Sequence, residues 1–87
     1  MTFFHANLHY YLEFDAHNLM GQIYHKMKEY PRADEQYLRA ISIFTVLKPE
    51  GFLINIVLKN LGALKISQGD LNSAIGYIDQ ALAGLHP

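Results

Sequence analysis

Hydrophobic residues recur along the chain at the spacing of an α-helix. Four stretches carry an apolar residue every three or four positions, and no stretch alternates with the two-residue period of a strand. Turn-forming residues separate these stretches at Tyr30-Pro31, Pro49-Glu50-Gly51 and Gly69-Asp70. The pattern predicts an all-α fold with helices over residues 3–28, 31–47, 51–68 and 71–84. Because the connections are short, we expect neighbouring helices to be antiparallel.

The second half of the chain repeats the first half at a fixed offset of 41 residues. The clearest matched positions are Gly21 with Gly62, Ala33 with Ala74, Tyr37 with Ile78, and Ala40 with Ala81. A period of this size is typical of stacked helical hairpins, each of which packs only on its neighbours. We therefore expect one domain with an N-terminal helix extension (1–13), a first unit (14–50) and a second unit (51–87).

The residue types in the two units carry a family resemblance. In the second unit, Asn60-Leu61-Gly62, Gly69-Asp70-Leu71 and Ala74-Ile75 resemble a tetratricopeptide repeat at nearly every key position. In the first unit, Leu19-Met20-Gly21 and Arg32-Ala33 resemble the same motif. The resemblance covers roughly residues 14–87 and implies a short superhelix of antiparallel hairpins that binds partners without catalysis.

The period departs from the usual 34 residues of this family. The seven extra residues lie between Ala40 and Gly62, which predicts about one added turn on each helix beside Pro49. Longer repeats of this kind look like those of kinesin light chains and of bacterial peptide-sensing regulators. Small residues allow two helices to approach closely, so we expect Gly21 to face Ala33 and the equivalent residues of the second unit to face each other.

The resemblance also implies a binding surface, because the first helix of each unit lines a concave groove in this family. Carried over by position, the groove would display Asp15, Asn18, Gln22, His25, Lys59 and Asn60. The amides can hydrogen-bond the backbone of an extended peptide, and the lysine can attract a carboxylate. The competing interpretation is an ordinary solvated helix face.

Composition and charge narrow the partners to proteins and peptides. The formal net charge is −1, so the chain lacks the excess of positive charge that is typical of proteins binding nucleic acid or an anionic membrane. The sequence contains no cysteine, so disulfide and thiol chemistry are excluded. Its longest apolar run, from Phe52 to Leu58, is too short to span a bilayer. With no signal-peptide pattern at the N-terminus, we expect a cytoplasmic protein.

Candidate chemistry is sparse. His5, His9, Glu13 and His17 follow one another at steps of four, so neighbours on one helix can share a metal. A single helix cannot close a tetrahedral site, however, and no metal site is expected. We find no catalytic triad order and no glycine-rich phosphate loop. The expectation is a protein that is not an enzyme and holds no cofactor.

Aromatic residues are dense before the first unit, and we predict that they mediate self-association into a homo-oligomer, most simply a dimer. The residues assigned to this contact are Phe4, Tyr11 and Phe14. The favoured function is a scaffold or adaptor that binds a protein or peptide. The alternative is a self-assembling structural or regulatory module, or part of a longer array of the bacterial peptide-sensing type.

Overall fold

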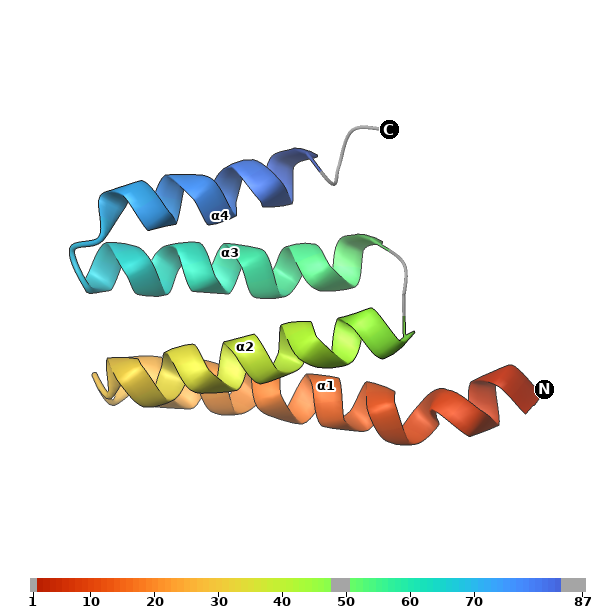
Figure 1. Cartoon of the computed structure of the whole chain (residues 1–87). Helices are drawn as coiled ribbons and strands as arrows, with labels where there is room; N and C mark the ends of the chain where they lie inside the picture. Colours follow the sequence, from red (N-terminus) through yellow and green to blue (C-terminus); the bar gives the residue numbers. More distant parts are fainter. Residues whose placement is uncertain (1, 48–50, 84–87) are drawn as a thin grey trace.

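Four helices make up the fold, as the sequence predicts. The computed structural model describes the backbone of residues 2–47 and 51–83, and the side chains of residues 8–43 and 54–83. The helices are α1 (Thr2–Lys26), α2 (Tyr30–Leu47), α3 (Gly51–Ser67) and α4 (Leu71–Ala83). α1 packs along α2 and α3 along α4, and the two hairpins meet through α2 and α3 (Figure 1). The all-α hairpin architecture is confirmed, and the predicted boundaries agree within two residues.

The turn that closes the first helix of each hairpin has the same geometry in both units. Lys28 adopts a left-handed φ of 63°, and Gly69, which lies 41 residues later, adopts a φ of 80°. In the first turn the Glu29 amide donates to the Tyr24 carbonyl at 2.9 Å. In the second turn the Asp70 amide donates to the Lys65 carbonyl at 2.8 Å. Both turns are therefore Schellman caps, and the sequence repeat is a structural repeat even where the two residue types differ.

Asp70 then begins α4. Its carboxylate accepts a hydrogen bond from the Ser73 amide at 3.2 Å, which is an N-cap interaction. Hydrogen bonds from Ser73 lower the pKa of the Asp70 carboxyl below its usual value of 3.8. A lowered pKa means that the ionised form favours the folded state, so this contribution is present above the ordinary carboxyl range and is lost as the pH falls through the lowered value.

The contact at the two mid-helix glycines differs from the sequence expectation. Gly21 faces the ring of Tyr37 and not Ala33: a Cβ added at Gly21 would lie 2.8 Å from Tyr37 Cζ and closer still to Cδ1 and Cε1. Gly62 faces Ile78, whose Cγ1 would lie 2.7 Å from an added Cβ, with the Ala74 carbonyl oxygen further away at 3.6 Å. The glycine thus makes room for a large side chain one turn beyond the alanine.

The core lies between the first hairpin and α3. Its buried members are Phe14, Ala33, Tyr37, Ala40, Val57, Leu61 and Leu64. α4 contributes one fully buried side chain in its described part, Ala74. Leu71, Ile75 and Leu82 of the same helix are more than half exposed. At the other end of the molecule, the N-terminal turns of α1 extend past α2 (Figure 1).

Candidate partner-binding site

A hollow with a volume of about 640 Å³ lies between α1 and α3, with α2 contributing two tyrosines. We call it the α1–α3 hollow. Its lining residues are Leu19, Gln22, Ile23, His25, Lys26, Lys28, Tyr30, Tyr37, Asn60, Ala63 and Ser67. Residues 19, 22, 23 and 26 share one side of α1 because a helix repeats every 3.6 residues, and residues 60, 63 and 67 do the same on α3.

Two hydrogen bonds between polar side chains fix α1 against α3 at this hollow. The Asn60 amide nitrogen donates to the Asn18 carbonyl oxygen at 3.0 Å. His25 Nε2 and Ser67 Oγ lie 2.8 Å apart. Both pairs are separated by 42 residues in sequence, so α1 and α3 run parallel in one constant register. The first helices of the two units therefore lie side by side and share the walls of the hollow.

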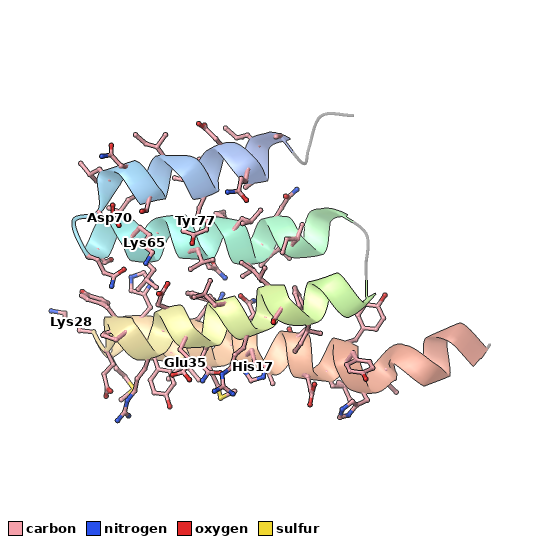
Figure 2. The ribbon with its side chains drawn as sticks, in the orientation of Figure 1. His17, Lys28, Glu35, Lys65, Asp70 and Tyr77 are labelled. Carbon is pink, nitrogen blue, oxygen red and sulfur yellow. The ribbon has the colours of Figure 1, made fainter. Side chains whose placement is uncertain are left out.

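An ion pair joins the two hairpins beside the hollow. Lys65 Nζ lies 3.1 Å from Asp34 Oδ1, and only 15% and 28% of the two side-chain surfaces are exposed. Figure 2 shows Lys65 pointing from α3 toward α2. The position of the first unit that matches Lys65 is Tyr24, over whose ring the Arg32 guanidinium lies at 5.9 Å. Because it is largely shielded from water, the Lys65–Asp34 pair fixes how one hairpin sits on the other.

The charge of the hollow differs in sign from that of the whole chain. Lys26, Lys28 and His25 line it, and no acidic side chain of the described residues does, whereas the formal net charge of the chain is −1. Burial raises the pKa of the Tyr37 phenol to about 12, so this side chain stays neutral at physiological pH. The lining thus offers cations and hydrogen-bond donors to a ligand that carries acceptors.

Three of the six residues predicted to bind a partner line the hollow: Gln22, His25 and Asn60. Asn18 is 8% exposed and lies beneath them as the partner of Asn60. Asp15 is exposed on α1 but does not line the hollow. Lys59 lines a different depression, between α3 and α4. Their roles in binding stay predictions.

The sequence reasoning missed two lysines of the hollow. Lys26 falls four residues after Gln22, so the helical period alone places both on one face. Lys28 reaches the hollow from the left-handed turn after α1, and the signal that could have found this turn is the 41-residue repeat, which aligns Lys28 with Gly69.

The side chains considered for self-association and for metal binding lie in different environments: His9 and Glu13 pair at 3.3 Å on the surface of α1, whereas others point into the core or toward α2. Phe14 is 5% exposed and belongs to the core, Tyr11 is half-buried, and Phe4 lies outside the described side chains. In the histidine row, His17 Nδ1 donates to Gln36 Oε1 at 2.6 Å, which turns it toward α2. Among the side chains that the structure describes, no three potential ligands gather into a metal site.

These observations define a class, a helical-hairpin repeat protein with a polar surface along its first helices. The family model described as the tetratricopeptide repeat matches residues 12–85, and the chain belongs to this family. Comparison with curated proteins and with solved structures gave no significant match. Within the described residues, no helix combines the length and the apolar character needed to cross a bilayer.

Proposed function

We propose that the protein is an interaction module that binds a peptide segment rich in carboxylates in the α1–α3 hollow. The observation that carries the proposal is the charge of the lining: Lys26 and Lys28 line the hollow and no described acidic side chain does, in a chain whose formal net charge is −1. Such a local excess of positive charge attracts and orients a ligand of opposite sign. Tetratricopeptide repeats serve as protein-interaction modules, and membership in the family supports this class of function.

The neutral residues of the hollow support binding of an extended backbone. Gln22 and Asn60 each carry an amide donor and an amide acceptor, which is the pair of groups that an extended peptide requires. The apolar residues Leu19, Ile23 and Ala63 provide surface for the side chains of the ligand. In this proposal Asp15 and Lys59 lie outside the peptide site. A cytoplasmic location and the lack of catalysis stay predictions.

Selection from a random peptide library tests the proposal, followed by fluorescence anisotropy on each selected peptide and on a version with Asp and Glu replaced by Asn and Gln. We expect the neutral version to bind roughly tenfold more weakly or worse. Lys26→Glu should weaken binding of the acidic peptide by a similar factor. Lys59→Glu is the matched control, since it changes the charge equally outside the hollow and should leave affinity nearly unchanged. Equal binding of acidic and neutral peptides would refute the proposal.

Self-assembly is a second candidate function, favoured by the apolar surface on α1. Leu12, Ile23 and Met27 are each more than half exposed, and they follow one another along one side of the helix. Contiguous apolar surface of this kind marks protein contacts more often than chance exposure does. The predicted dimer is one form of such assembly.

A further inference from the structure

The exposed surfaces at the two ends of the molecule correspond by the repeat to the two surfaces that pack together between the hairpins. α3 covers the first hairpin with three side chains that are fully or almost fully buried: Val57, Leu61 and Leu64. The matching residues of α1, 41 positions earlier, are Ala16, Met20 and Ile23, and all three are exposed. α1 therefore presents outward the face that α3 uses to pack on the first hairpin.

The other end presents the complementary half. On the first hairpin, α3 packs on a surface that includes Tyr37, Ala40 and Ile41. The matching residues of α4, together with two residues of α3, line an open depression of about 220 Å³: Ile78, Ala81, Leu82, Asn55 and Lys59. We call this depression the α3–α4 groove. Leu82 and Ile75 beside it are 51% and 58% exposed.

We propose that a second copy of the chain packs its α1 into the α3–α4 groove, so that molecules stack head to tail. The register follows from the two hydrogen bonds between α1 and α3, which join residues 42 apart. In the stack, α3 takes the place of α1, and α1 of the second copy takes the place of α3, two repeats of 41 residues further along. Two repeats less the offset of 42 leave 40, so each α3 residue lies opposite the α1 residue of the second copy whose number is 40 lower. Asn55 is then opposite Asp15 of the second copy, and Lys59 is opposite its Leu19.

The polar groups of the groove fit this register. Asn55 is 9% exposed, yet neither its side-chain nitrogen nor its oxygen has a hydrogen-bond partner among the residues that the structure describes. A buried amide without a partner is destabilising, so a partner from outside would be favoured. Asp15 of the second copy supplies a carboxylate that can accept from the Asn55 amide. Lys59 lies one helical turn beyond Asn55 and adds an opposite charge near the same carboxylate.

A second position agrees with the stacking. Inside the molecule, Lys65 of α3 pairs with Asp34 of α2. In the stacked arrangement, the equivalent residues are Tyr24 of the second copy and Ile75. An aromatic and an aliphatic residue thus stand where the internal contact has two charges, so stacking would not bring an unpaired Lys or Asp there. The Arg32 guanidinium over the Tyr24 ring is itself paired with Glu29 at 3.3 Å.

Head-to-tail contact does not close, because each added copy exposes a new α3–α4 groove. Mass should therefore rise with concentration beyond that of a dimer. Sedimentation velocity from micromolar to millimolar concentration measures this. Ala16→Glu blocks the α1 face, and Leu82→Glu blocks the groove. Leu38→Glu is the matched control, since Leu38 is an exposed residue of α2 that belongs to neither face. Circular dichroism confirms that each variant is helical.

We expect each blocked variant to stay at the 10.0 kDa mass of one chain and the control to associate as the parent does. Mixed together, the two blocked variants should form a dimer that grows no further, since each retains one intact face. Asp15→Lys should weaken association of the parent by roughly tenfold, and Lys59→Asp in the same chain should restore part of it. A parent that stays monomeric, a mixture that does not dimerise, or full association of Leu82→Glu through α1 alone would overturn the proposal. None of the substituted residues lines the α1–α3 hollow, although the stacking face shares Leu19 and Ile23 with it.

Discussion

Lys28 occupies a backbone conformation that suits glycine. Its φ of 63° is left-handed, which costs a residue with a Cβ about 1–2 kcal/mol, whereas glycine adopts it freely. We predict that Lys28→Gly raises the free energy of unfolding by about 0.5–1 kcal/mol, after the greater chain entropy of glycine is subtracted. Urea denaturation followed by circular dichroism measures the change.

The second unit provides the reverse experiment for the same turn. Gly69 has a φ of 80° and no atom near an added Cβ, so Gly69→Ala tests conformation without steric contact. It should lower the free energy of unfolding by about 1 kcal/mol. If both substitutions moved stability in the same direction, the two caps would not be equivalent.

At the scale of helices, the two mid-helix glycines predict unequal costs for the same substitution. Gly21→Ala drives a methyl group into the ring of Tyr37, a large and rigid side chain that is 1% exposed. Gly62→Ala meets Ile78, which borders the open α3–α4 groove and can shift. We expect Gly21→Ala to destabilise by about 1–3 kcal/mol and Gly62→Ala by less. Thermal unfolding of the two variants side by side compares them, and equal costs would contradict this account.

The helices themselves were predictable because strong local signals mark their ends. Proline at 31 and 49 and glycine at 69 interrupt the helical period, so the boundaries follow from backbone chemistry alone. The partner of Gly21 was not predictable in the same way. Whether a glycine faces Ala33 or Tyr37 depends on where two helices cross, and residues one turn apart satisfy the sequence pattern equally well.

The candidate site shows the same limit of sequence reasoning. Lys59 and Asn60 are adjacent, and successive residues of an α-helix point about 100° apart. The family resemblance assigned both to one groove, but Asn60 lines the α1–α3 hollow and Lys59 lines the α3–α4 groove. Gln22 and Asn60 both line the hollow, because the apolar stripe of each helix fixes the direction in which they point relative to the core.

For the whole molecule, the Lys65–Asp34 ion pair is one of the polar contacts that couple the two hairpins. Lys65→Met leaves a largely buried carboxylate unpaired and should lower the free energy of unfolding by about 1–2 kcal/mol, a figure reduced from the fully buried case by the remaining exposure. Adding Asp34→Leu should recover most of the loss, because an apolar pair replaces the ionic one. A double-mutant cycle by chemical denaturation gives the coupling energy, and additive losses would contradict a direct interaction.

Contacts in the described part of the molecule run only between neighbouring elements and between α1 and α3, and α1 does not touch α4. This connectivity bears on how such a chain can change in length during evolution. A tandem duplication of one 41-residue unit would add a hairpin without disturbing any existing contact except at the junction. The new junction would bring together the two faces that the present molecule exposes at its ends, so selection would have few positions to adjust before a longer array became stable.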